Sequence, residues 1–164
     1  MTPNQQSGLS LIEVLVAVAV FAFGLLAIAA LMANGMRMST SSMQRSFAIN
    51  QAYDMADRIR ANPSANYDGI LDGATGPESN KDPACITDTA GGGCSKEQMM
   101  GYDQYHWNTQ NADFLPSGEG SVEKTGDIYR ITVRWDDTRG GVTGRGCDPA
   151  NSDDMTCFQF EFQP

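Results

Sequence analysis

The chain has 164 residues and a formal net charge of −9, a length that suits one ordinary domain with an additional segment. The acidic balance disfavours non-specific nucleic-acid binding and electrostatic attachment to anionic lipid, because both require a dense basic surface. A single histidine, His106, gives little basis for a multi-histidine metal site or a catalytic relay, so the composition favours a membrane-attached binding or structural protein over an enzyme.

The first predicted element is an apolar helix near the N-terminus. Residues 14–33 contain no polar side chain, and Glu13 is the only charged residue before Arg37. A helix of this length spans about 30 Å, the hydrocarbon thickness of a bilayer. Residues 1–8 contain no Lys or Arg and the apolar run is long, so a cleaved secretory signal fits poorly. Either Glu13 reaches the headgroups of an ordinary anchor, or it is a functional acid within the apolar segment.

The residues around Glu13 favour the second interpretation. The string GLSLIEVLVA, which begins at Gly8, resembles the class III signal of type IV prepilins and pseudopilins. The resemblance implies that residues 1–8 are a leader, removed by cleavage between Gly8 and Leu9, and that Leu9 is then N-methylated. It also implies that Glu13 is the acid of the fifth mature position. In a packed filament, its carboxylate would neutralise the N-terminal amine of a neighbouring subunit, since both charges are unfavourable when buried alone.

We expect the apolar helix of residues 9–36 to continue as an amphipathic helix over residues 37–61. Its predicted buried face consists of apolar residues at helical spacing, namely Met36, Met43, Phe47, Met55 and Ile59. The pair Asn62-Pro63 predicts a helix end at Ala61, because proline disfavours helix in the residue before it. The whole helix would then be about 80 Å long.

Residues 62–164 are expected to form an α+β head. The stretch 62–93 is rich in Pro, Gly, Ser, Asn and Asp and therefore predicts a loop region. Ser95 and Gln98 match a capping box, which predicts a helix that runs to about Asn108. On this helix we expect His106 to pack or form a hydrogen bond rather than act as a ligand or a base.

Strands are predicted in the last third of the chain. Apolar and polar residues alternate in residues 129–135 and again in 158–163, which predicts two strands that each have one buried and one solvated face. Gly126-Asp127 suits the turn of a hairpin from a strand at residues 121–124. The outward Arg130 and Arg134 offer a basic stripe for DNA or an acidic partner, with Arg139 and Arg145 nearby. A solvated sheet face is the favoured interpretation.

The four cysteines predict two disulfides, because an exported head meets an oxidising compartment. Three connectivities are possible, and we favour the local pairs Cys85–Cys94 and Cys147–Cys157, each of which closes a loop beside a structured element. Zinc is not expected without a C-x-x-C pair, and the acidic segment 148–154 does not match an EF-hand calcium loop. No cofactor, metal site or catalytic constellation is predicted.

Over most of its length the chain resembles the minor pilins of type IV pili. Besides the N-terminal signal, the resemblance rests on the segment 48–63 (AINQAYDMADRIRANP) and on the order Trp107, Leu115-Pro116, Val133-Arg134-Trp135. It implies a type IV pilin-like α+β fold, with a long N-terminal helix packed on a small antiparallel sheet. It further implies a non-enzymatic subunit that primes pilus assembly and lies in the tip complex of pili used for twitching motility, adhesion and DNA uptake.

The implied partners are other minor pilins, the major pilin, the prepilin peptidase and the inner-membrane assembly platform, with no direct nucleic-acid partner. The implied location is a single span of the inner membrane with a periplasmic head, followed by incorporation into the pilus at the cell surface. Two alternatives remain open. They are a minor pseudopilin of a type II secretion system and a signal-anchored periplasmic binding module.

Overall fold

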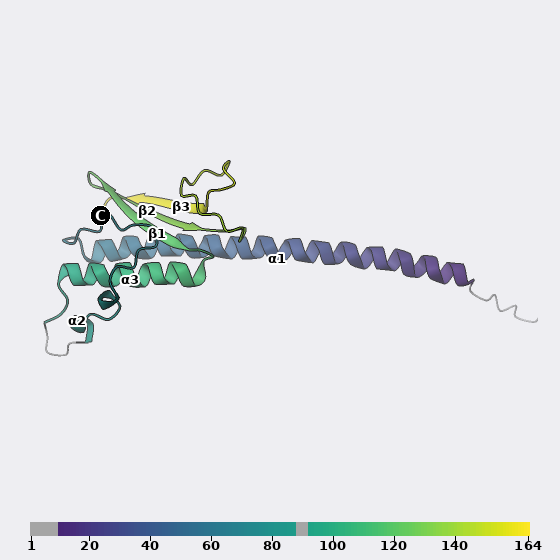
Figure 1. The fold of residues 1–164 in the computed structure, drawn as a ribbon, viewed down its shortest axis with the longest axis horizontal. Coiled ribbons are helices and arrows are strands. Elements are labelled where there is room, and N and C mark those ends of the chain that lie inside the picture. The colour runs from purple at the N-terminus through teal and green to yellow at the C-terminus, as the bar shows by residue number, and fades with distance from the viewer. Residues whose placement is uncertain (1–9, 88–91) are drawn as a thin grey trace, which may run out of the picture. The chain divides into compact units, whose positions relative to one another are not determined.

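The computed structural model describes residues 10–87 and 92–164, and Gly8 and Leu9 lie outside these ranges. The contacts divide the chain into an N-terminal unit that ends at Thr40 and a head, Ser41–Pro164. The elements, labelled in Figure 1, are α1 (Leu11–Ala61), η1 (Glu78–Asn80), α2 (Ala84–Thr87), α3 (Lys96–Phe114), β1 (Glu119–Thr125), β2 (Ile128–Trp135) and β3 (Thr156–Phe162).

The described part of the N-terminal unit consists of Ser10 and the first part of α1, which is apolar on every side over residues 14–33. Its large side chains are exposed, for example Leu11 at 79% and Phe23 at 72%. The most apolar stretch of α1 has a mean hydropathy of 2.9, and none of it is buried. By length and composition, the helix is able to cross a membrane.

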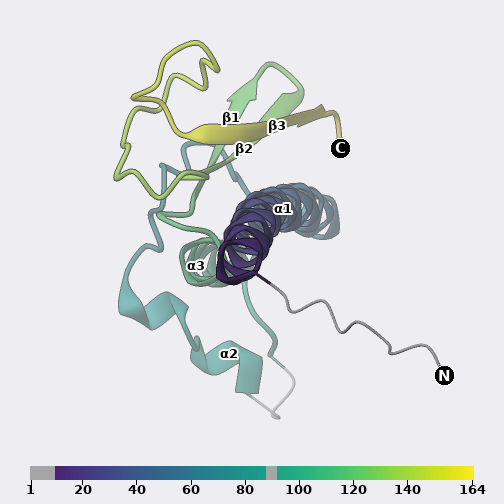
Figure 2. The same cartoon turned by 90° about the vertical axis from the view of Figure 1, so that its right-hand side faces the viewer.

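Within the head, α1 lies between α3 and the sheet (Figures 1 and 2). The predicted buried face is only partly right, because Met55 and Ile59 are buried whereas Met43 is 67% exposed, as is Met36 (66%) of the N-terminal unit. The buried face of α1 is formed instead by Gln44, Ala48, Gln51, Ala52, Met55, Ala56 and Ile59. Alanines leave room for large neighbours, and the fully buried Trp107 of α3 donates from Nε1 to the Gln51 carbonyl at 2.9 Å. The helical spacing of large apolar residues in the sequence does not identify a buried face that contains several alanines.

Helix α3 begins at the predicted capping box, in which Ser95 and Gln98 each accept a hydrogen bond from the other's backbone N–H. Its predicted end at Asn108 is wrong, because the helix continues to Phe114. The polar residues in this part of the helix do not end it, because they form hydrogen bonds in the interior of the head. Asn108 donates to the Ala74 carbonyl and accepts from the Gly120 N–H, both at 2.9 Å.

The head carries an antiparallel sheet of order β1-β2-β3, which confirms the predicted fold class of a long helix packed on a small antiparallel sheet. Gly126-Asp127 forms the hairpin turn as expected, and Gly126 adopts a φ of 61°, which glycine accepts without strain. The face of β2 toward the core is lined by Tyr129, Ile131 and Val133, which are all buried.

The opposite face of the sheet differs from the predicted solvated surface. Arg134 is only 8% exposed, and its guanidinium pairs with Asp72 and donates to the Ser121 hydroxyl at 3.0 Å. Arg145 binds the Glu119 carboxylate through two donors, at 2.6 and 2.7 Å. Asp72 and Glu119 therefore neutralise Arg134 and Arg145 at this end of the face, so these two arginines do not form a free basic stripe, and Arg134 is not solvated.

Candidate assembly surface

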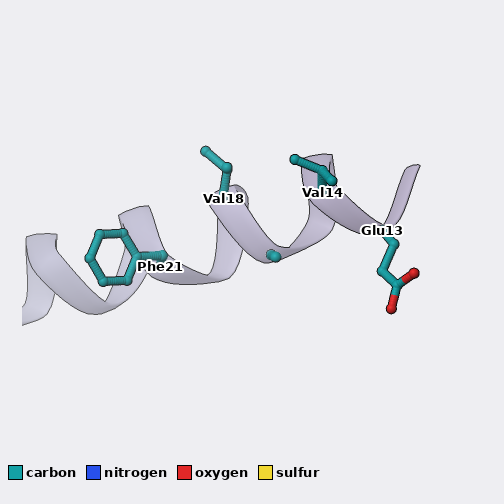
Figure 3. Close-up of a pocket in the computed structure, with 5 residues that line it drawn as sticks. Glu13, Val14, Val18 and Phe21 are labelled. Atoms are coloured by element: carbon teal, nitrogen blue, oxygen red, sulfur yellow. The ribbon is translucent and has the colours of Figure 1, made fainter. Parts of the chain in front are cut away.

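The acid singled out by the sequence, Glu13, lies in the first turn of α1. A shallow hollow on the helix surface is lined by Glu13, Val14, Ala17, Val18 and Phe21. Figure 3 shows the Glu13 carboxylate extending away from the helix at one end of this row. The hollow is therefore an apolar surface that ends in one negative charge.

A carboxylate in this position is favourable within its own helix, because the unpaired N–H groups of a helix N-terminus attract negative charge. It is unfavourable in an apolar environment unless a positive group lies beside it. In the described part of the N-terminal unit the only basic residue is Arg37, about 36 Å farther along the helix. No basic side chain in the described part of the N-terminal unit therefore lies near enough to neutralise Glu13.

The surface beyond the hollow suits contact with other helices. An added Cβ at Gly24 or Gly35 would meet nothing within 4 Å, so neither glycine is required by packing inside this chain. Small residues let helix backbones approach each other closely in a membrane, where packing rather than the hydrophobic effect drives association. The N-terminal unit thus offers an apolar surface with small-residue positions and one acid.

A charged cluster in the head fixes α1 against α3. Arg58 of α1 donates to Asp54 on its own helix and to Asp103 of α3, both at 2.8 Å. The Tyr67 hydroxyl donates to the other oxygen of Asp103 at 2.6 Å. Burial, together with the hydrogen bond to Asp103, raises the pKa of Tyr67, so this hydroxyl remains a donor at physiological pH. The spacing of Asp54 and Arg58 is visible in the sequence, but the partners from distant segments are not.

The structure pairs Cys85 of α2 with Cys94, which lies just before α3, and Cys147 of the loop after β2 with Cys157 of β3. The acidic segment between the last two is organised by its own backbone. Asp154 accepts from the Asp148 N–H at 3.1 Å, and Asp148 accepts from the Ala150 N–H at 2.9 Å. Within residues 10–87 and 92–164, no group of three or more His, Cys, Asp or Glu side chains is placed to hold a metal ion.

His106 is half-buried on α3, and its Nε2 forms a hydrogen bond with the Lys81 carbonyl at 2.8 Å. Its ring packs against Tyr102, with a centroid distance of 4.2 Å. These contacts confirm the packing and hydrogen-bonding role predicted for it. The hydrogen bond to Lys81 joins the end of η1 to α3, whereas the ring contact with Tyr102 lies within α3.

Two family models match the chain. Residues 3–29 match the prokaryotic N-terminal methylation motif, and residues 30–105 match the family described as type IV pilin Tt1218. No curated protein and no solved structure gives a significant match.

Proposed function

We propose that the chain, which matches the N-terminal methylation motif over residues 3–29 and the type IV pilin Tt1218 family over residues 30–105, is a type IV pilin component and, more specifically, a PilV-like minor pilin. The observation that carries the proposal is the first part of α1, which is apolar on every side, exposed along its length and marked by a single acid. Such a surface has no function in isolation. It requires a bilayer or other helices around it.

On this proposal the protein works by association rather than by catalysis. The prepilin peptidase removes residues 1–8, and the new N-terminus at Leu9 is methylated. The apolar helix spans the inner membrane before assembly and packs among the helices of other pilins afterwards. Glu13 then sets the axial register, because its carboxylate is stable in this environment only beside a neighbour's amine.

The proposed role of the head is to select neighbours. Together with other minor pilins it would prime assembly on the inner-membrane platform and then occupy the pilus tip, in front of the major pilin. Its two disulfides suit a periplasmic location, since disulfides form and persist in oxidising compartments. Such pili serve twitching motility, adhesion and DNA uptake.

The test is to delete the gene and measure both surface pili and protein secretion, with quantitative mass spectrometry of sheared pili from the parent strain. We expect pili to be lost and restored by complementation, and we expect the protein in sheared pili far below the amount of the major pilin. Equal amounts would make it a major pilin. Normal pili with lost secretion would assign it to a type II secretion system.

A further inference from the structure

The rest of the head covers one edge of the sheet and leaves the other edge unpaired in the described residues. The outer edge of β1 is covered by residues 68–73, where the Gly69 N–H donates to Val122 at 3.1 Å and the Gly73 N–H donates to Gly120 at 3.2 Å. Further along the same edge, the Val122 N–H donates to Ile70 at 2.9 Å and the Lys124 N–H donates to the Asp68 carboxylate at 2.8 Å. This edge therefore has no free row of backbone groups to offer another chain.

The outer edge of β3 has no such cover over residues 156–162. In the part of the chain that the structure describes, β3 pairs with β2 and no strand lies on its other side. The backbone hydrogen bonds of the neighbouring loop reach only the residues before the strand, where the Met155 N–H donates to Gly144 at 2.8 Å. Within β3 itself, this loop is joined to the second residue by the Cys147–Cys157 disulfide. An unpaired edge of this length is a template for a further strand.

The sequence of β3 also lacks the devices that usually protect an edge. Its seven residues, TCFQFEF, contain no Pro and no Lys, and they pair with β2 residue by residue without a bulge. Glu161 carries the only charge, and it is bound to Arg130 at 2.8 Å. β3 is therefore suited to pairing with a further strand, and its sequence contains no proline or lysine that would prevent this.

A second copy of this chain does not fit as the partner. Figure 1 shows that β3 runs in the same direction as the head part of α1. Symmetric antiparallel pairing of two β3 strands would make the two head segments of α1 run in opposite directions. Subunits anchored in one membrane, or stacked in one filament, present these segments in parallel, so an antiparallel partner strand comes from a different kind of head.

We propose that the outer edge of β3 binds an extended segment from the head of another pilin by strand addition, an inference that rests on the proposed function. The two faces of β3 define the chemistry of this segment. On the core side, Phe158 and Phe160 are half-buried, and Phe160 packs on Tyr53 with ring centroids 4.6 Å apart. Gln159 and Glu161 lie on the other side. The added segment therefore alternates aromatic or β-branched residues with hydroxyl-bearing or basic residues.

Site-specific photocrosslinking in intact envelopes tests the proposal. A benzoylphenylalanine at position 159 probes the open edge, and the same residue at position 123 is the matched control. Both native side chains, Gln159 and Glu123, are exposed on the same face of the sheet, but Glu123 lies in the covered strand. We expect position 159 to crosslink to the head of another pilin and position 123 to give at least tenfold less of that product.

A second experiment uses full-length variants. Gln159→Lys places a positive charge beside a basic or hydroxyl-bearing segment, so we expect co-purification with other pilins to fall by about two- to fivefold, the range for one cross-strand pair. Glu123→Lys is the control, and an unchanged urea midpoint for both variants shows that the head is intact.

Three results would overturn the strand-addition proposal. The first is equal crosslinking from positions 159 and 123. The second is crosslinking from position 159 only to a second copy's β3, or to no pilin. The third is co-purification that Gln159→Lys leaves unchanged. If the unsubstituted protein already brings down no other pilin, the proposed function fails together with this proposal. If the unsubstituted protein co-purifies with other pilins but none of them crosslinks to β3, only the strand-addition proposal fails.

Discussion

The N-terminal unit and the head use apolar residues in opposite ways. In the N-terminal unit Leu31 is 72% exposed, whereas in the head Ile131 of β2 is fully buried. The head stabilises itself, because its apolar side chains leave water when it folds. The first part of α1 buries nothing within its own chain, so its stability depends on what surrounds it. The head therefore folds around its own buried core, whereas the exposed apolar surface of the N-terminal unit is suited to a bilayer or to other helices.

The largest expected effect concerns maturation of the N-terminal unit. Gly8→Ala adds a Cβ where the peptidase must approach the backbone, so we expect processing to be abolished. The measurement is intact mass spectrometry of the membrane-extracted protein, which should lose the lighter species that begins at N-methyl-Leu9. Ser7→Ala is the control and should still be processed. Normal processing of Gly8→Ala would exclude the predicted cleavage site.

The second expected effect is the clearest test of the contrast between the two units. Ile131→Ala should lower the free energy of unfolding by about 2–5 kcal/mol, because it leaves a cavity in the core. Leu25→Ala in the N-terminal unit should change it by about 0.5 kcal/mol or less. Urea unfolding of the full chain in detergent, followed by tryptophan fluorescence, measures both. Similar losses for the two variants would mean that the first part of α1, up to Thr40, also folds as part of the head.

The sequence predicts those parts of the fold whose signal is local. The end of α1 at Ala61, the capping box at Ser95 and the hairpin turn at Gly126 depend on neighbouring residues, and the structure has all three. The buried face of α1 and the end of α3 depend on distant partners. Trp107 donates to the Gln51 carbonyl of α1, and the buried Asn108 is satisfied by Ala74 and Gly120, which no helical period reveals.

The third expected effect concerns the disulfide loops of the head. Replacing Cys85 and Cys94 together by serine removes a bridge between residues nine apart in sequence. We expect a loss of about 2–3 kcal/mol, because the unfolded chain gains freedom. The paired replacement of Cys147 and Cys157, which are ten residues apart, should cost a similar amount. Urea unfolding measures both variants, and a stability equal to that of the parent would mean that the bridges do not form.

The smallest expected effect is a pH dependence of the head. Burial opposes ionisation of Asp136, but the Gly141 and Gly140 N–H groups donate to its carboxylate and hold its pKa below the ordinary 3.8. A lowered folded-state pKa adds stability that is present above the unfolded-state pKa and is lost as pH falls through the folded-state pKa. Asp136→Asn should therefore be less stable at about pH 5 and should lose less stability on acidification. The unfolding midpoints of the parent and of Asp136→Asn, measured at about pH 5 and at more acidic pH, give this difference in stability. Parallel curves of midpoint against pH for the two proteins would contradict the prediction.

The candidate assembly surface follows a similar division. Glu13 could be identified from the sequence because its spacing from Gly8 and the apolar run lie within one short segment. The open edge of β3 could not, since it depends on residues 68–73 covering the other edge of the sheet. The neutralised arginines were equally hidden, because Arg134 meets Asp72 only in the folded head.

The most direct test of the account is co-purification of the Glu13→Ala variant with other pilins from solubilised envelopes. If the Glu13 carboxylate pairs with a neighbour's N-terminal amine, the variant should still be processed at Gly8 but should recover about tenfold less partner pilin. This is the loss expected for a charge-assisted contact of about 1.4 kcal/mol or more. Ser10→Ala, a change in the same part of the chain that leaves the acid in place, should retain the parent level. Unchanged recovery with Glu13→Ala would contradict the claim that this acid holds neighbouring subunits together.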